Sequence, residues 1–169
     1  TYHFGEVWKN HYEQYRKDLE NMEKQREHSM FCYQCQETAK GTGCDVRGVC
    51  GKTAEVSNLQ DLLIYTVKGI SEIVVKGNLN VEELDDVNHQ VLTSLFMTIT
   101  NANFDDEAIE AQIRKNIVTR DELRQGIEVS DLHDACTFEV DTRESILEKA
   151  ASVGILSTKD EDIRSLREL

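Results

Sequence analysis

The sequence predicts a mainly α-helical protein, an antiparallel helical bundle preceded by an irregular, cysteine-rich loop. Three observations support this fold class. The chain has 169 residues and no proline, so no helix is interrupted by that residue. From residue 58 onward, apolar residues recur every three or four positions, which is the period of a helix that buries one face. Four cysteines fall within nineteen residues where this period is absent.

Residues 1–29 are expected to form a helical extension in front of the domain. Charged residues alternate over residues 4–28 with a thin apolar stripe, which consists of Val7, Tyr12, Tyr15, Leu19 and Met22. Such a narrow stripe stabilises an isolated helix only marginally, so we expect it to pack on the domain or on a partner. Met30 is a candidate start codon, and we interpret the extension as a tag, a fusion or a lineage-specific arm.

Residues 30–57 are expected to form the cysteine-rich loop, and residues 58–169 the bundle. The first long helix of the bundle is expected to be capped by Ser57 or Asn58 and to end at Gly77 and Asn78. Its apolar face should consist of Leu59, Leu62, Leu63, Val67, Ile70, Ile73 and Val74. A second helix is predicted over residues 81–100. Its inward-facing residues are expected to be Val81, Leu84, Val87, Val91, Leu92, Leu95, Phe96 and Ile99.

A third helix is predicted over residues 105–127, with the acidic first turn that the helix dipole favours. Residues 129–141 break the helical period and predict a loop or a short strand pair. The next helix should begin at a cap formed by Thr142 or Ser145 and stop at Gly154. The last helix begins at residues 160–162 and ends while its apolar stripe is still forming, so we expect the bundle to be truncated there.

The charge of the chain excludes several classes of partner. The formal net charge is −13, and residues 78–169 hold 21 acidic and nine basic side chains. Such a surface repels phosphate backbones and anionic lipids, so we expect neither nucleic acid nor a membrane as a partner. No apolar run approaches the roughly 20 residues that span a bilayer, and no secretory signal is recognisable, which predicts a cytoplasmic protein.

The four clustered cysteines are Cys32, Cys35, Cys44 and Cys50, with the spacing C-x2-C-x8-C-x5-C. An odd total of five cysteines argues against a disulfide framework. The first pair suits one metal centre, and the longer spacers allow the backbone to wrap around something larger than an ion. An iron–sulfur cluster is therefore favoured over zinc, which more often uses two C-x2-C pairs, and over a loop without metal.

Other residues of the cysteine segment fit this interpretation. Gly41, Gly43, Gly48 and Gly51 either let the backbone approach a cluster closely or only form turns, and both roles are compatible. The cations Lys40, Arg47 and Lys52 would stabilise an anionic cluster and favour its reduced state, unless they are simply exposed loop residues.

Cys136 stands apart from this segment, beside His133 and Asp134. The three residue types could form a nucleophilic site, but neighbours in sequence seldom form a catalytic triad. We therefore expect a small buried thiol at this position.

From Met30 onward the sequence resembles the hybrid cluster proteins, also called prismane proteins or hydroxylamine reductases. The resemblance is carried by MFCYQCQETAKGTGCDVRGVCGK, NLQDLLIYTVKGI, LFMTITNANFDD and SVGILSTKDEDIRSLREL, in this order. It implies that Cys32, Cys35, Cys44 and Cys50 bind a [4Fe-4S] cluster, which accepts an electron from a redox donor protein. It also implies that the complete enzyme reduces hydroxylamine or nitric oxide.

The same resemblance implies a second cluster of iron, sulfur and oxygen, whose ligands lie in later catalytic domains. This chain contains none of those ligands, so no catalytic residue is assigned and the chain alone is expected to be inactive. Two alternatives remain open from the residues. One is a stand-alone iron–sulfur or zinc module with a redox-sensing or scaffolding role, and the other is a metal-free fragment that self-associates through exposed helix faces.

Overall fold

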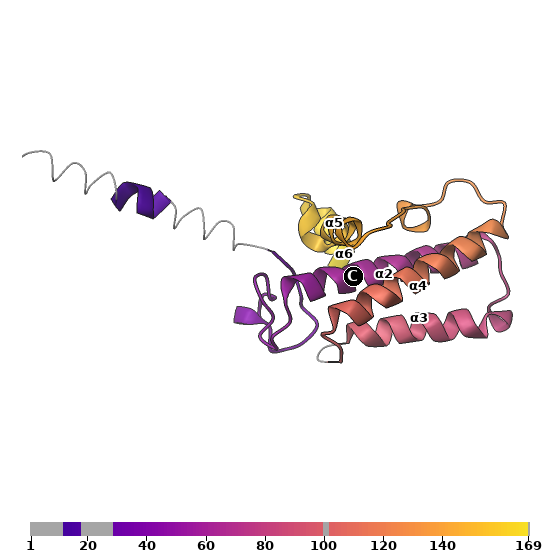
Figure 1. Cartoon of the computed structure of the whole chain (residues 1–169), viewed down its shortest axis with the longest axis horizontal. Coiled ribbons are helices and arrows are strands. Elements are labelled where there is room, and N and C mark those ends of the chain that lie inside the picture. Colours follow the sequence, from indigo (N-terminus) through magenta and orange to yellow (C-terminus); the bar gives the residue numbers. More distant parts are fainter. Residues whose placement is uncertain (1–11, 18–28, 100–101, 169) are drawn as a thin grey trace, which may run out of the picture.

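The structure, a computed structural model, describes residues 12–17, 29–99 and 102–168. It confirms the mainly α-helical fold (Figure 1). The long helices are α2 (Ala54–Lys76), α3 (Asp85–Thr98), α4 (Asp106–Gln125), α5 (Arg143–Val153) and α6 (Glu161–Glu168). Short 3-10 turns are η1 (Ala39–Gly41), η2 (Val81–Glu83), η3 (Asp134–Cys136) and η4 (Ile155–Ser157). Within the described ranges, β pairing is limited to one isolated bridge.

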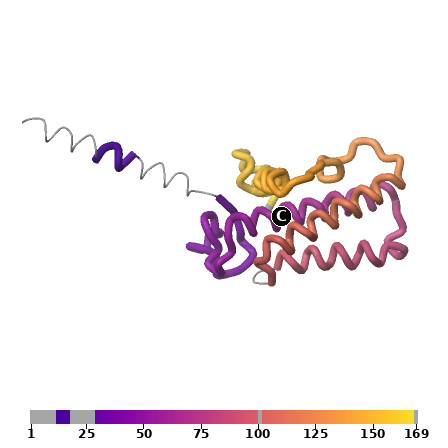
Figure 2. The backbone as a smooth tube through the Cα atoms, in the orientation of Figure 1, coloured from indigo at the N-terminus to yellow at the C-terminus, as the bar shows by residue number. Residues whose placement is uncertain are grey.

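Helices α2, α3 and α4 run alternately up and down beside one another, and α5 covers another side of α2 (Figure 2). Helix α2 begins earlier than predicted, because Thr53 is its cap and the Thr53 side chain accepts a hydrogen bond from the Val56 amide at 3.2 Å. The predicted caps Ser57 and Asn58 were wrong, and both lie inside the helix. Its end at Gly77 is as predicted.

The hydrophobic core lies where α2, α4 and α5 meet. Its buried members are Val56, Leu59, Leu62, Leu63, Ile109, Ile113, Phe138, Ile146 and Ala150. The predicted apolar face of α2 is confirmed except at Val74, which is only half-buried. Helix α4 begins at the Asp105 cap, and α5 begins with a capping box formed by Thr142 and Ser145. The core therefore holds α2 rigidly, and the cysteine loop leads directly into this helix.

Helix α3 contradicts the prediction that its apolar side faces the core. Its buried residues are polar, namely Gln90, Ser94 and Thr98. The exposed apolar residues on this stretch are Val81, Leu92, Leu95, Phe96 and Ile99. The reason is a buried hydrogen-bond network that faces α3, which we call the polar cluster. It consists of Thr66, Gln90, Ser94, Gln112, Asn116 and Thr119.

Asn116 lies at the centre of the polar cluster. Its side-chain oxygen accepts hydrogen bonds from the amides of Gln90 at 2.9 Å and Gln112 at 3.1 Å. Its own amide donates to the hydroxyls of Thr66 at 2.8 Å and Ser94 at 3.0 Å. Because buried polar groups must be hydrogen-bonded, these bonds fix the rotation of α3 about its axis, and its apolar residues are turned outward.

The remaining segments differ less from expectation. Residues 129–141 form a loop with the single turn η3, and no strand pair occurs there. Helix α3 is shorter than predicted, because η2 takes up the first residues. Residues 12–17 are helical, with Tyr12 and Tyr15 exposed. The rest of the predicted extension, including Val7, Leu19 and Met22, lies outside the described residues.

Candidate metal centre

The cysteine loop is held closed by a bridge between Cys32 and Cys44. Each residue donates its amide to the other's carbonyl oxygen, at 2.9 Å in both directions. Such a mutually hydrogen-bonded pair places the two Cα atoms about 5.5 Å apart. The structure therefore brings together two of the four predicted ligands, the first and the third cysteine of the motif.

The surroundings of Cys44 resemble those of a metal-bound thiolate. Cys44 is buried, and its sulfur accepts a hydrogen bond from the Ala39 amide at 3.4 Å. Backbone N–H bonds to sulfur are the outer-shell contacts that tune iron–sulfur clusters. Ala39 is the first residue of turn η1. This turn is closed by a hydrogen bond of 3.0 Å from the Gly41 amide to the Thr38 carbonyl oxygen.

Gly48 makes a close backbone approach to another predicted ligand. A Cβ atom at Gly48 would lie 3.0 Å from the sulfur of Cys50 and 2.9 Å from Cβ of Lys52. No other residue type fits there without displacing one of these groups. The other three glycines of the segment, Gly41, Gly43 and Gly51, have positive φ, a conformation that glycine adopts most readily.

Lys52 is the buried cation of the loop, with 1% of its surface exposed. Its ammonium donates hydrogen bonds to Gln60 Oε1 at 2.7 Å, to Gln34 Oε1 at 3.3 Å and to Cys32 Sγ at 3.6 Å. Lys40 and Arg47 are exposed, as loop cations without a special role would be. Sequence reasoning grouped the three cations, and the structure separates them.

The four predicted ligands are not all gathered at one point. Cys35 is half-buried and Cys50 is exposed, and all four thiols are free of disulfides. In the portion of the chain that the structure describes, no three His, Cys, Asp or Glu side chains are gathered as a metal site. The donor set nevertheless fits a thiolate-bound cluster, because the loop provides four free thiols, an N–H donor to sulfur and a buried cation.

A cavity of about 420 Å³ adjoins this loop and is lined by Cys32, Gln34, Lys52, Gln60 and Asp61, among others. Burial raises the pKa of the Asp61 carboxyl to about 7, although Lys52 and Lys68 oppose the shift. Sequence reasoning missed Gln60 and Asp61. The available signal was the pair of polar residues in the otherwise apolar stretch LQDLLI near the start of α2.

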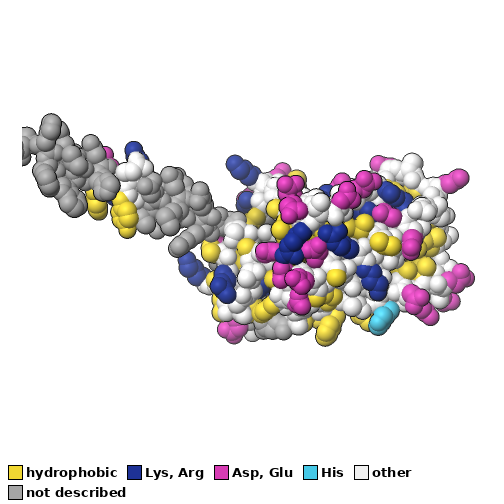
Figure 3. Space-filling model, in the orientation of Figure 1, with side chains coloured by type: hydrophobic (Ala, Val, Ile, Leu, Met, Phe, Trp, Pro, Cys, Tyr) yellow, Lys and Arg dark blue, Asp and Glu magenta, His cyan; other side chains and the backbone are white. Residues whose placement is uncertain are grey.

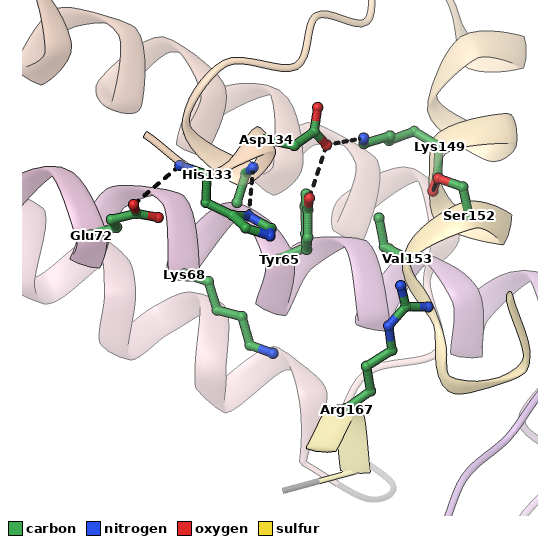
Figure 4. A pocket seen from close by; sticks show the side chains of 10 residues that line it. Tyr65, Lys68, Glu72, His133, Asp134, Lys149, Ser152, Val153 and Arg167 are labelled. Carbon is green, nitrogen blue, oxygen red and sulfur yellow. Dashed lines mark hydrogen bonds and ion pairs between the residues drawn. The ribbon is translucent and has the colours of Figure 1, made fainter. Parts of the chain in front are cut away.

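A second cavity, of about 490 Å³, lies around η3 (Figure 4). There Tyr65 and Lys149 both point at Asp134, and the Tyr65 hydroxyl donates to its carboxylate at 2.9 Å. His133 Nδ1 accepts a hydrogen bond from the Ala135 amide at 3.1 Å. Neither His133 nor Asp134 therefore contacts the thiol of Cys136 as a base would.

Cys136 is a fully buried thiol, as predicted. It lies 3.5 Å from the Gly69 carbonyl oxygen and 3.4 Å from Glu72 Oε2, to both of which it can donate. Burial, followed by the Glu72 carboxylate, raises the pKa of this thiol to about 11. A thiol that stays protonated is a poor nucleophile, which agrees with the expected buried thiol and not with the alternative of a nucleophilic site.

The surface agrees with the charge of the sequence. Figure 3 shows acidic side chains spread over the visible face instead of forming one patch. Over residues 12–17, 29–99 and 102–168, no helix has both the length and the apolar character needed to cross a membrane.

Comparison with known proteins matches residues 30–169 to the model of the Prismane/CO dehydrogenase family. Among similar proteins is the hydroxylamine reductase of Acetivibrio thermocellus, 66% identical over 141 residues. Those of Desulfitobacterium hafniense and Clostridium perfringens are 51% and 48% identical over 151 and 149 residues. Each alignment covers 83% of this chain. The chain spans only 26% to 27% of the length of these relatives.

Proposed function

This chain belongs to the Prismane/CO dehydrogenase family, and from that membership we propose that residues 30–169 form the N-terminal electron-transfer domain of a hydroxylamine reductase-like hybrid cluster protein. Proteins of this family bind iron–sulfur clusters, and the loop of this chain has the thiols that such a cluster needs. The single observation that carries the proposal is the closed loop. The backbones of Cys32 and Cys44 are hydrogen-bonded to each other, and the Ala39 amide donates a hydrogen bond to the Cys44 sulfur.

We propose Cys32, Cys35, Cys44 and Cys50 as the ligands of a [4Fe-4S] cluster. When bound, this cluster would accept one electron from a donor protein and pass it to the rest of the enzyme. The residues around it have separate roles. The backbone bridge holds Cys32 and Cys44 together, the Ala39 amide stabilises negative charge on the Cys44 sulfur, and Gly48 leaves room beside Cys50.

For the whole protein we propose reduction of hydroxylamine or nitric oxide in the cytoplasm. The similar proteins are named hydroxylamine reductase, and about three quarters of their length has no counterpart in this chain. The second, hybrid cluster and the catalytic residues are assigned to that portion. The partners of this chain are accordingly a redox donor protein and the remaining catalytic domains, and not nucleic acid or a membrane.

The proposal is tested by measuring iron, zinc and acid-labile sulfide per chain after purification without oxygen. We expect about four irons and four sulfides in the wild-type chain. The variant Cys44→Ser should lose most of both, whereas the matched control Cys136→Ser, which removes a thiol outside the loop, should keep them. Equal cluster content in both variants would contradict the ligand assignment.

Other outcomes would favour the alternative functions. About one zinc per chain without sulfide would indicate a stand-alone structural module. A chain that contains no metal and no sulfide would indicate a metal-free fragment. Concentration-dependent sedimentation would then support association through exposed helix faces. Hydroxylamine turnover by this chain alone, above that of free iron and sulfide, would contradict the assignment of catalysis to the missing portion.

A further inference from the structure

Lys52 is a buried cation without a close anionic partner among the described residues. Its ammonium is bonded to the side-chain oxygens of Gln34 and Gln60 and to the sulfur of Cys32, and none of these groups is a carboxylate. Burying an ammonium costs several kcal/mol unless it is paired with negative charge. The fold therefore holds a positive charge against the sulfur of Cys32, and this charge needs a negative partner nearby.

Asp61 does not fill that role well. This carboxyl lines the same cavity as Lys52, but burial raises its pKa to about 7 despite the attraction of the lysine. Near neutral pH Asp61 therefore balances only part of the ammonium charge.

We propose that Lys52 is the counter-charge of the cluster and a positioning residue that raises its reduction potential, an inference that rests on the proposed function. Four thiolates give an iron–sulfur cluster a net negative charge, and reduction adds one further unit. A fixed positive charge stabilises the reduced form more than the oxidised form. One electron passes from the external donor, which is oxidised, to the cluster, which is reduced, and no covalent bond to the protein changes.

Gln60 holds the ammonium in place. Its side-chain oxygen accepts the hydrogen bond of 2.7 Å from Lys52, which is the shortest of the three. The amide nitrogen of Gln60 donates to the carbonyl oxygens of Met97 and Asn103, at 3.3 Å each. These two bonds define which end of the Gln60 side chain faces Lys52. Met97 at the end of α3 and Asn103 before α4 thereby fix the position of a charge in the cysteine loop.

The test is a redox titration of the cluster in this chain, monitored by electron paramagnetic resonance with dithionite as the one-electron reductant. The variant Lys52→Met should disfavour reduction at least tenfold, which is about 59 mV for a one-electron couple. The matched control Lys40→Met removes an exposed charge from the same segment and should change the potential much less. Equal shifts in the two variants, or none, would overturn the proposal.

A second variant keeps the proposal testable if Lys52→Met does not fold. Gln60→Glu leaves Lys52 and all cysteines in place but gives the ammonium a carboxylate partner, so it should also lower the potential. An unchanged potential in this variant would overturn the role of Lys52. Failure of the proposed function is distinguishable, because the wild-type chain would then bind no iron and sulfide and would give no cluster signal to titrate.

Discussion

Gly69 and Ala135 are in such close contact that a Cβ atom on Gly69 would lie 2.3 Å from the carbonyl oxygen of Ala135. Gly69 lies in the middle of α2, where glycine is a poor helix former. The close approach allows η3 to lie directly against α2, and it places the Cys136 thiol 3.5 Å from the Gly69 carbonyl. The missing side chain at Gly69 is thus required by packing.

The variant Gly69→Ala should destabilise the chain although alanine favours helix formation by about 1 kcal/mol. The added methyl group would displace η3 from α2, and overpacking of this kind costs typically 1–3 kcal/mol. Urea denaturation followed by circular dichroism measures the free energy of unfolding. We expect a net loss and an increase in the exposure of Cys136.

Gly126→Ala is the matched control for this prediction. A Cβ atom there would lie 3.6 Å from the Leu123 carbonyl oxygen, which is ordinary van der Waals contact. We expect little change in the free energy of unfolding for this variant. Equal effects of the two substitutions would contradict a structural role for the contact between Gly69 and Ala135.

The variant Asn116→Ala should also be strongly destabilising. It would remove a hydrogen bond from each of four side chains of the polar cluster, and a lost hydrogen bond costs about 0.5–1.5 kcal/mol. Each of the four side chains keeps another hydrogen bond, so we expect a loss of at least about 2 kcal/mol in urea denaturation. Glu122→Ala, an exposed position on the same helix, is the control and should change stability by less than about 0.5 kcal/mol. Similar losses in both variants would contradict a structural role for the polar cluster.

The polar cluster also explains where prediction of the fold from sequence failed. The helical period of the sequence identified the helices and the buried face of α2, because apolar residues recur along that face of α2 without a gap. On α3 the same rule gave the wrong face, since Gln90, Ser94 and Thr98 find their partners on α4 or on the α3 backbone. Pairing between two helices is not visible in the period of one of them.

At the candidate site, sequence reasoning found the thiols and the loop but not their environment. Spacing alone suggested a compact centre at the four cysteines. Lys52 is buried and bonded to Gln60 of α2, and the bond from Gln60 to Met97 depends on the end of α3. These are tertiary relationships, so the sequence could not distinguish Lys52 from Lys40 and Arg47.

Cys136 should resist alkylation in the folded chain. Only the thiolate reacts with iodoacetamide, and burial together with Glu72 raises the pKa of this thiol to about 11. In cluster-free chain at about pH 8, mass spectrometry should find Cys50, which is exposed, modified well before Cys136. Denaturation in urea should abolish the difference. Early modification of Cys136 would contradict the buried position of η3.

The exposed apolar face of α3 should promote association of this chain. Leu92 is 65% exposed and Phe96 is 62% exposed, and Figure 3 shows apolar side chains at the surface along the edge where α3 lies in Figure 1. The variant Phe96→Lys should reduce concentration-dependent sedimentation and change stability by less than about 0.5 kcal/mol. His89→Lys adds a positive charge at another exposed position on α3 and serves as the control. Equal association in both variants would place the contact elsewhere.

The stability of the chain should depend on pH through Asp61. Its folded pKa is raised to about 7 from 3.8, so the folded state keeps a proton that the unfolded chain releases. Stability should therefore fall as the pH rises from about 4 to about 7, and Asp61→Asn should gain stability relative to wild type across this range. Asp134→Asn should show the opposite sign, because the Lys149 ammonium and the Tyr65 hydroxyl hold the pKa of Asp134 below its ordinary value. That variant should be less stable than wild type at neutral pH, with a deficit that shrinks as the pH falls below about 4. Urea denaturation over this pH range measures both effects, and a difference between Asp61→Asn and wild type that does not vary with pH would contradict the raised pKa.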